Sequence, residues 1–168
     1  MEELEIGGKK YEIKFNHRFY DRVLSDFAKK HKDSDSDGFN NLIAGLIDED
    51  PDAVVRAYRC AIVGKTQPTA NDVSDALDEA GFFDNDDVFS DVFKQIKSSG
   101  FLAGKIRHLL KLMHDDWKDS EIALKVVSEH ADKKAKDYKE KLRTTQLAVA
   151  ARKEAYELAK KQLAELGK

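Results

Sequence analysis

The residues most suggestive of chemistry in this chain of 168 residues are the aspartates of residues 33–38, which read Asp-Ser-Asp-Ser-Asp-Gly. Alternate carboxylates followed by glycine match the first half of a calcium-binding EF-hand loop. The second half does not match, because Ala44 stands where the loop needs a glutamate with two ligand oxygens, and Asn40 stands where it needs an apolar residue. We therefore interpret residues 33–38 as a solvated acidic linker without bound calcium.

Histidine and cysteine do not offer a metal site or a nucleophile either. The sequence has no His-Glu-x-x-His motif, and His108 and His114 are six residues apart, which puts them on nearly opposite sides of a helix. Cys60 is the single cysteine, so an internal disulfide and a cysteine-based zinc cage are excluded, and we expect this thiol to be buried. Residues 114–116, His-Asp-Asp, have no neighbouring nucleophile and are interpreted as a solvated turn at a helix end.

Glycine motifs that cradle phosphates are also missing from the sequence. It contains no Walker loop and no Gly-x-Gly-x-x-Gly run, and Gly7 and Gly8 lie between two predicted strands rather than before a helix. Because every candidate fails, the sequence predicts a protein that is not an enzyme and has no catalytic, cofactor-binding or metal-binding residues.

The charge of the chain limits its partners. There are 29 basic and 32 acidic residues, which gives a formal net charge of −3 and no overall basic field for nucleic acid or anionic lipid. The charged fraction of 36% exceeds the usual value of about 25%, which indicates much solvated helix surface. The acidic N-terminus does not resemble a signal peptide, and no apolar run approaches the roughly 18 residues of a membrane span. We therefore expect a protein of a reducing cytoplasm.

The first element that the sequence predicts is a β-hairpin. Apolar and charged residues alternate on both sides of Gly7 and Gly8, which supply the positive φ angles of a tight turn. An isolated hairpin is barely stable, so we expect its apolar face to pack on the helices that follow. That face consists of Leu4, Ile6, Tyr11, Ile13 and Phe15.

Five short amphipathic helices are predicted next. Asn16, Asp50 with Pro51, and Thr69 are the signals that start the first, third and fourth helix, and glycines at 64, 81 and 100 end the last three. Helices this short depend on packing against each other. Their expected ranges are about 17–30, 39–47, 51–63, 69–80 and 88–99.

The C-terminal part has a different composition. From about residue 119 to residue 166 it is rich in Ala, Glu, Lys and Leu, which predicts one long helix, with a break near residues 114–116. This helix carries a weak heptad pattern interrupted by small and polar residues. Two interpretations stay open: it pairs with a partner or with itself, or it is a solvated helix that frays alone.

The expected fold class is mainly α (α+β): an N-terminal β-hairpin packed on a bundle of short helices, followed by a long C-terminal charged helix. We expect two domains. Residues 1–115 would form the hairpin with the helical bundle, and residues 116–168 the long charged amphipathic helix, partly disordered when alone.

The order of these parts resembles that of the tail assembly chaperones of long-tailed (siphovirus-like) phages and prophages of Gram-positive bacteria. The resemblance covers about residues 3–103, and none of its motifs is catalytic. It depends on the ordered succession of residues 6–15, 42–46, 48–54, Tyr58, 68–69, 73–79 and 93–101.

The resemblance implies a function in virion morphogenesis. Such chaperones bind the tape-measure protein, a long, helical and aggregation-prone chain, in the cytoplasm of the bacterial host before the tail tube polymerises around it. They are absent from the mature virion. The resemblance also implies a longer, frameshifted product of the same gene. As further partners we expect the tail tube protein, this longer form and a second copy of the chain, with no cofactor and, from the charge and hydropathy of the chain, no nucleic-acid or membrane partner.

A partner helix would need apolar anchors at helical spacing, and we expect residues 101–145 to supply them. The alternative is that residues 101–110 complete the core of the helical bundle. The candidate partner-binding residues are Phe101, Leu102, Ile106, Leu109, Leu110, Ile122, Val126 and Val127.

Two other functions stay open at this point. The chain could be a structural component of a phage tail or a head–tail connector, which would remain in the particle. It could also be a small regulatory protein that binds nucleic acid through its lysine-rich C-terminal helix, although glutamates interleave with those lysines.

Overall fold

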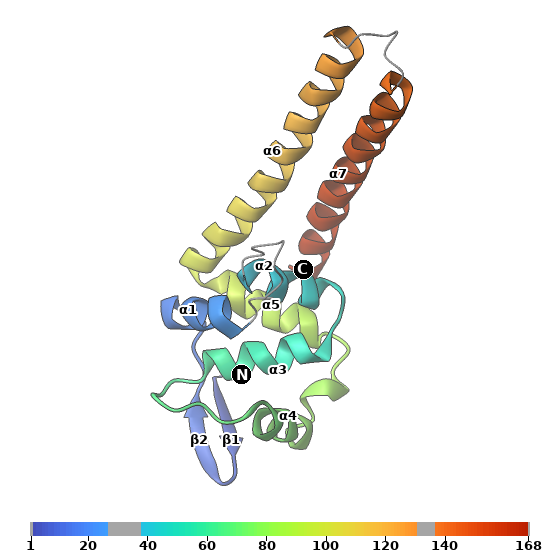
Figure 1. Ribbon diagram of the computed structural model, residues 1–168. Helices are drawn as coiled ribbons and strands as arrows, with labels where there is room; N and C mark the ends of the chain where they lie inside the picture. The colour runs from blue at the N-terminus through green and yellow to red at the C-terminus, as the bar shows by residue number, and fades with distance from the viewer. Residues whose placement is uncertain (1, 27–37, 131–136, 168) are drawn as a thin grey trace. The chain divides into compact units, whose positions relative to one another are not determined.

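A computed structural model describes residues 2–26, 38–130 and 137–167 of the chain (Figure 1). The described residues are mostly helical and open with one two-stranded antiparallel sheet, which confirms the predicted fold class. The predicted acidic linker at 33–38, apart from Gly38, and the end of the first predicted helix lie outside the described residues. The elements are β1 (Glu3–Ile6), β2 (Lys9–Glu12), α1 (His17–Asp26), α2 (Gly38–Ile47), α3 (Pro51–Ala61), α4 (Ala70–Glu79), η1 (Phe82–Asp84), α5 (Val88–Ser98), α6 (Gly100–His130) and α7 (Tyr138–Leu166).

The β-hairpin forms where the sequence predicts it. Gly7 and Gly8 both have positive φ, at 57° and 76°, which is the backbone of a two-residue turn between β1 and β2. Beyond Glu12 the chain continues extended but changes partner, because Ile13 bridges to Ile62 just after α3. The hairpin is therefore joined to the helical bundle by backbone hydrogen bonds as well as by its apolar face.

The predicted helix starts are confirmed. Asn16 Oδ1 accepts a hydrogen bond from the Phe19 amide at 3.2 Å, and Asp50 Oδ1 accepts one from the Asp52 amide at 3.0 Å. Thr69 opens α4 with a complete capping box. Two predicted stops are wrong. Helix α3 ends at Ala61 with Ile62 as its cap, before Gly64. The extended backbone of Ser99 already ends α5, so Gly100 begins α6 instead.

The chain divides into two compact units, which are described separately. One comprises Met1–Lys105 with Glu165–Lys168, called here the N-terminal unit, and the other comprises Ile106–Ala164, called the helical hairpin. The expected domains 1–115 and 116–168 stay a prediction. Among the described residues, no helix combines the length and the apolar character needed to cross a membrane.

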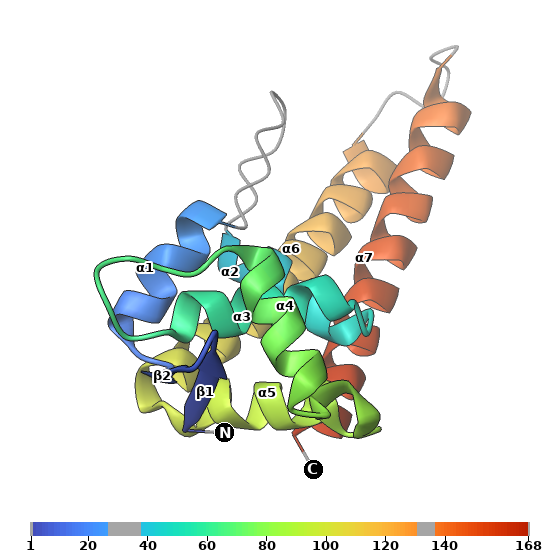
Figure 2. The same ribbon diagram turned by 90° about the horizontal axis from the view of Figure 1, so that it is seen from below.

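The N-terminal unit is organised around α3. This helix contacts α1, α2, α4 and α5 (Figure 2), and most of its side chains are buried. Tyr58 at its centre is fully buried, with its ring edge-to-face against Phe82 and its hydroxyl accepting a hydrogen bond from Gln95 Nε2 at 3.2 Å. The aromatic ring brings a large buried area, and the glutamine satisfies its polar end.

The helical hairpin consists of antiparallel stretches of α6 and α7. Arg152 Nε lies 2.8 Å from Asp116 Oδ2, and the rings of Trp117 and Tyr156 stack with centroids 5.8 Å apart. Asp116 and Arg152 are 36 residues apart, and in one straight helix they would be separated by about 54 Å. Their contact therefore shows that the predicted uninterrupted helix from 119 to 166 is divided into two. The predicted break near residues 114–116 is also wrong, because α6 continues through them.

The heptad pattern of the C-terminal part proves to be the inner face of this hairpin. On α7 its positions are buried or half-buried, apart from Arg152, which pairs with Asp116 across the seam. Of the two open interpretations, the structure therefore favours a pairing helix, with α6 of the same chain as its partner. The inner positions of α7 are Leu142, Thr145, Val149, Tyr156, Ala159 and Leu163.

Gly38 provides a test of the packing between α1 and α2. A Cβ at this position would clash with the Val23 carbonyl oxygen and lie 2.9 Å from Leu24 Cα, whereas a Cβ at Gly100 would meet nothing within 4 Å. We expect Gly38→Ala to lower the free energy of unfolding by about 1–3 kcal/mol, because backbone atoms of α1 must move. Gly100→Ala should be neutral or stabilise by up to about 1 kcal/mol. Urea denaturation measures both, and equal stability of the two variants would contradict this packing.

Candidate partner-binding surfaces

No catalytic centre emerges from the residues that the structure describes. They include no group of three or more His, Cys, Asp or Glu side chains placed to hold a metal ion. His114 Nδ1 lies 3.5 Å from Asp115 Oδ1, its ring contacts Trp117 and Tyr156, and the adjacent Asp116 carboxylate pairs with Arg152. The His-Asp-Asp run is thus part of the packing of the helical hairpin.

Cys60 is buried, as expected, and lies beside a carboxylate. Its Sγ lies 3.6 Å from Asp26 Oδ2, to which it donates, and burial raises the pKa of the thiol to about 12, with the nearby Asp26 charge acting in the same direction. A thiol with this pKa is protonated throughout the physiological range, and only the thiolate reacts.

A basic pocket lies at the C-terminal end of α3. It has a volume of about 350 Å³, and its cationic lining residues are Lys14, Arg18 and Arg22. The Arg22 guanidinium donates hydrogen bonds to the carbonyl oxygens of Cys60, Ile62 and Gly64, with the Gly64 bond at 2.6 Å. These carbonyls have no intrahelical partners at a helix end, so a planar five-donor group caps α3 from the neighbouring helix.

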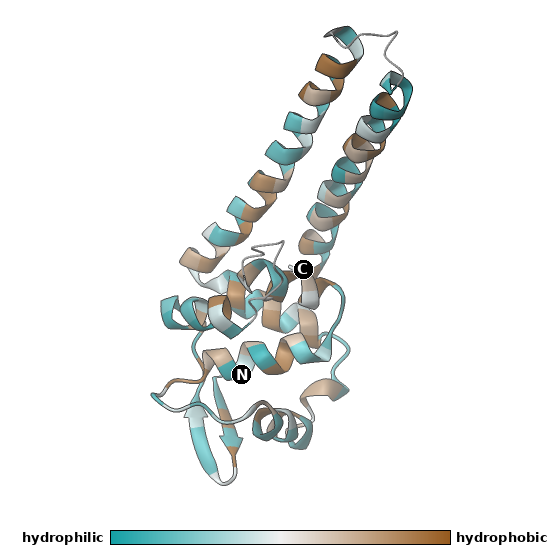
Figure 3. Cartoon of the chain, viewed as in Figure 1, coloured by the Kyte–Doolittle hydropathy of each residue, from teal (hydrophilic) through white to brown (hydrophobic). Residues whose placement is uncertain are grey.

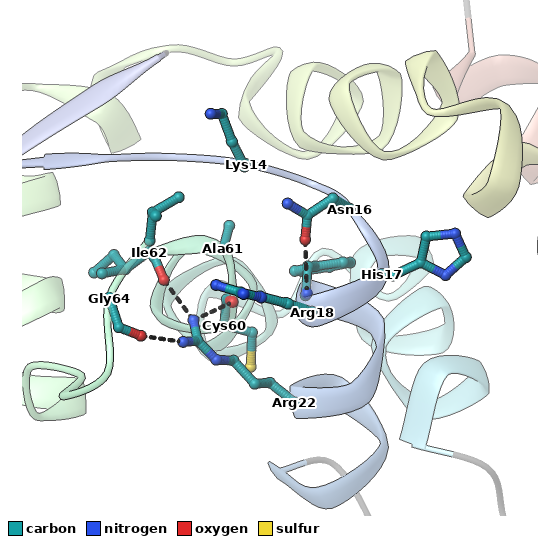
Figure 4. A pocket seen from close by; sticks show the side chains of 11 residues that line it. Lys14, Asn16, His17, Arg18, Arg22, Cys60, Ala61, Ile62 and Gly64 are labelled. Carbon is teal, nitrogen blue, oxygen red and sulfur yellow. Dashed lines mark hydrogen bonds between the residues drawn. The ribbon is translucent and has the colours of Figure 1, made fainter.

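Arg18 adds a positive charge to this pocket that is not used to cap the carbonyl groups of α3. It lies one helical turn before Arg22, and Figure 4 shows both side chains extending from α1 towards the same carbonyl-lined floor, whereas His17 points away. Arg18 forms no ion pair with any residue that the structure describes. Like charges four residues apart on a helix repel each other, so an anionic group from outside would stabilise this arrangement.

An acidic groove lies at the opposite end of α3. Its volume is about 570 Å³, and it lies between the N-terminus of α3, α4 and the segment from η1 into α5. Its apolar lining includes Val55, Phe83 and Phe89, and four carboxylates accompany these side chains. The carboxylates belong to Glu49, Asp52, Asp78 and Asp86.

The structure distributes the predicted partner-binding residues over different environments. Phe101 is half-buried, with its ring 3.9 Å from the His17 ring and 5.4 Å from the Tyr20 ring, and Leu102 is fully buried. The positions of Phe101 and Leu102 agree with the alternative that residues 101–110 complete the core of the helical bundle. Ile106 is also buried, and Leu109, Leu110 and Val127 are half-buried.

Ile122 and Val126 are the two predicted residues that remain exposed, at 62% and 52%. Sequence reasoning missed three other exposed apolar side chains of the helical hairpin: Leu112, Leu147 and Leu158. The signal for Leu147 and Leu158 was available, because they are large apolar residues outside the heptad positions. Apolar residues recur along both helices in Figure 3.

The described residues form a mostly helical protein with a basic pocket, an acidic groove and a set of exposed apolar side chains. The family model described as phage tail assembly chaperone protein, TAC, matches residues 3–111, and the chain belongs to this family. No curated protein and no solved structure matches the chain. Membership confirms the resemblance drawn from the order of the sequence motifs, and a chaperone family suggests a non-enzymatic role.

Two buried groups in the C-terminal half of α3, the Tyr58 hydroxyl and the Cys60 thiol, predict how stability changes at high pH. Burial raises the pKa of Cys60 from 9.0 and that of Tyr58 from 10.0, each to about 12, so the folded chain keeps both protons at a pH where the unfolded chain has lost them. The stabilising contribution is therefore complete below pH 9 and is lost as the pH rises towards 12.

We expect the free energy of unfolding to fall over this range, and to fall less steeply in Cys60→Ala, which lacks one of the two groups. Urea denaturation at a series of pH values measures the slopes. Indistinguishable slopes for the variant and the unchanged protein would show that Cys60 ionises normally in the folded state.

Proposed function

We propose that this chain binds the tape-measure protein of its phage in the host cytoplasm and keeps it soluble until the tail tube assembles around it. It acts without catalysis or a cofactor, and it leaves before the virion is complete. Family membership supports the chaperone role, and the exposed apolar side chains of the helical hairpin support the mode of binding.

The observation that best supports this mode of partner binding is the location of the exposed apolar side chains. Among the described residues, six large apolar side chains are exposed, and five of them are on the helical hairpin. Scattered exposed apolar residues are normal, but their concentration on one unit marks an interaction surface. The five are Leu112, Ile122, Val126, Leu147 and Leu158.

These side chains lie on the outer faces of the hairpin. Val126 comes nine residues after Trp117, and Leu147 comes nine residues before Tyr156; nine residues are two and a half helical turns. Because Trp117 and Tyr156 stack on each other in the seam, Val126 and Leu147 point away from it. Val126 and Leu147 therefore do not contribute to the packing between α6 and α7.

Spacing along each helix matches what a helical partner needs. Ile122 and Val126 are four residues apart, and Leu147 and Leu158 are eleven apart, or about three turns, so each pair forms a stripe along one face. Two helices pack through such stripes, which suits the helical tape-measure protein.

Substitution of the outer face tests this proposal. In coexpression with the tape-measure protein of the same phage, we expect Leu147→Asp/Leu158→Asp to reduce the yield of soluble tape-measure protein about tenfold or more. Burial of each leucine contributes roughly 1.5–3 kcal/mol, and 1.4 kcal/mol is tenfold in affinity. The measurement is the soluble fraction of the tape-measure protein and its copurification with the chaperone.

The matched control is Ala150→Asp/Ala155→Asp, which adds the same charges to exposed positions of α7 without removing a large apolar side chain. It should preserve solubility. If both variants keep the tape-measure protein soluble, or if neither does, the outer stripe of α7 is not its binding surface.

The composition of the particle separates this function from that of a structural tail or connector protein. We expect quantitative mass spectrometry of purified virions to find the tail tube and tape-measure proteins but not this chain, because a chaperone must leave the inside of the tube. Detection at a constant number of copies per particle would instead identify a structural component.

A further inference from the structure

The basic pocket carries positive charge that the fold itself does not use. We propose that it binds a short acidic segment of a protein partner, with carboxylates of that segment on the Arg18 and Arg22 guanidinium groups and an apolar side chain beside Val63. The pocket belongs entirely to the N-terminal unit. This binding goes beyond that of the tape-measure protein and does not depend on it, because it uses a surface other than the outer faces of the helical hairpin.

The floor of the pocket presents a guanidinium group with donors to spare. Three of the five N–H groups of Arg22 donate to the carbonyl oxygens of Cys60, Ile62 and Gly64, and the other two make no hydrogen bond to a residue that the structure describes. The three bonds also cover the carbonyl oxygens, which would otherwise repel an anion. A carboxylate can accept two parallel N–H bonds from one guanidinium group, and such charge-assisted pairs are among the strongest hydrogen bonds in proteins.

Two further donors line the same pocket. Arg18 is exposed, and its side chain makes no hydrogen bond or ion pair with a described residue. Asn16 uses its Oδ1 to cap α1, which leaves its amide NH₂ group as a donor. Lys14, by contrast, is already paired, with its Nζ 2.6 Å from Glu12 Oε1. An anion in the pocket would thus meet two unneutralised guanidinium groups and one neutral donor (Figure 4).

The size and the rim of the pocket indicate the kind of ligand. Its volume of about 350 Å³ lies at the lower end of the range of binding pockets, about 300–1,000 Å³, so it admits a few side chains of one short segment. Val63 lines the pocket and is 38% exposed, and it is the one exposed large apolar side chain among the described residues of the N-terminal unit. Complementarity therefore favours a segment in which carboxylates accompany an apolar residue.

A protein segment suits this pocket better than the phosphate chain of a nucleic acid. Proteins that bind nucleic acid present a continuous basic stripe or patch, because each neutralised phosphate adds to the affinity. Here the segments that frame the pocket also carry Glu12, Asp21 and Asp26, and the whole chain has a net charge of −3. The positive charge is therefore confined to the pocket and has no basic track leading away from it.

Fluorescence anisotropy with a synthetic peptide tests the binding. The probe is a short labelled peptide in which pairs of glutamates flank a single leucine, and it is titrated with the purified full-length chain. We expect saturable binding that weakens as salt is added, since salt screens exposed charges. The same peptide with glutamine in place of glutamate should bind at least about tenfold more weakly, because it forms no bond from a guanidinium group to a charged acceptor. Equal binding of the two peptides overturns the proposal.

Two variants locate the peptide. Arg18→Gln removes the unpaired cation, and Asn16→Asp keeps an oxygen that can cap α1 while it replaces the amide donor by negative charge. Each should weaken binding at least about tenfold, and circular dichroism checks that each is folded. The matched controls are Arg107→Gln and Asn71→Asp, which make the same changes at exposed helical positions outside the pocket and should bind like the unchanged chain.

Three further outcomes would refute the proposal. A peptide that does not bind, or that binds both pocket variants as tightly as the unchanged chain, does not use this pocket. Tighter, Arg18-dependent binding of single-stranded DNA of equal charge would show that the pocket takes phosphates. Leu147→Asp/Leu158→Asp should bind the peptide normally, so failure at the outer face of α7 and failure at the pocket are distinguishable. Loss of binding in that variant would place the peptide on the helical hairpin instead.

Discussion

Burial of α3 is the constraint on which the N-terminal unit depends. A helix whose side chains are mostly buried still has unpaired backbone groups at both ends, and these groups need partners from elsewhere in the protein or from water. Asp50 provides one at the N-terminus, and at the C-terminus Arg22 reaches over from α1 to the free carbonyls. The polar groups that solve this local problem are acidic at one end and basic at the other, as the helix dipole favours. Capping thus accounts for part of the charge at each end of α3, while Arg18 at one end and Asp78 and Asp86 at the other add charge that capping does not require.

The helical hairpin follows a different principle. Its seam contains alanine, serine and threonine beside a few aromatic rings, and a cross-seam pair between Asp116 and Arg152 stands where a coiled coil would have an apolar residue. The buried Trp117 Nε1 has no hydrogen-bond partner within the structure described. Such a seam is a weaker contact than a leucine-rich one, and several of the largest apolar residues face outward instead. Large apolar side chains therefore stay exposed on this unit.

Local signals in the sequence were sufficient for the starts of the elements. The Gly7–Gly8 turn, Asn16, Asp50–Pro51 and Thr69 each act within four residues, so their effects could be predicted without knowing the fold. The surfaces could not be predicted in this way. Arg22 meets the carbonyl of Gly64 across 42 positions, and the acidic groove collects residues from Glu49 to Phe89. The division of the C-terminal helix was missed for the same reason, because only contacts across the seam, such as those between Asp116 and Arg152 and between Trp117 and Tyr156, distinguish a hairpin from a straight rod.

The length of the helical hairpin has a consequence for stoichiometry. α7 has 29 residues and therefore spans about 43 Å. A partner helix lying along its outer stripe is covered over the same length, which corresponds to about 29 residues of that partner. Under the proposed function one copy would cover one short stretch, so the number of copies required would grow in proportion to the length of the chain they cover. The amount of chaperone that the infected cell must supply would then follow the length of the tape-measure protein.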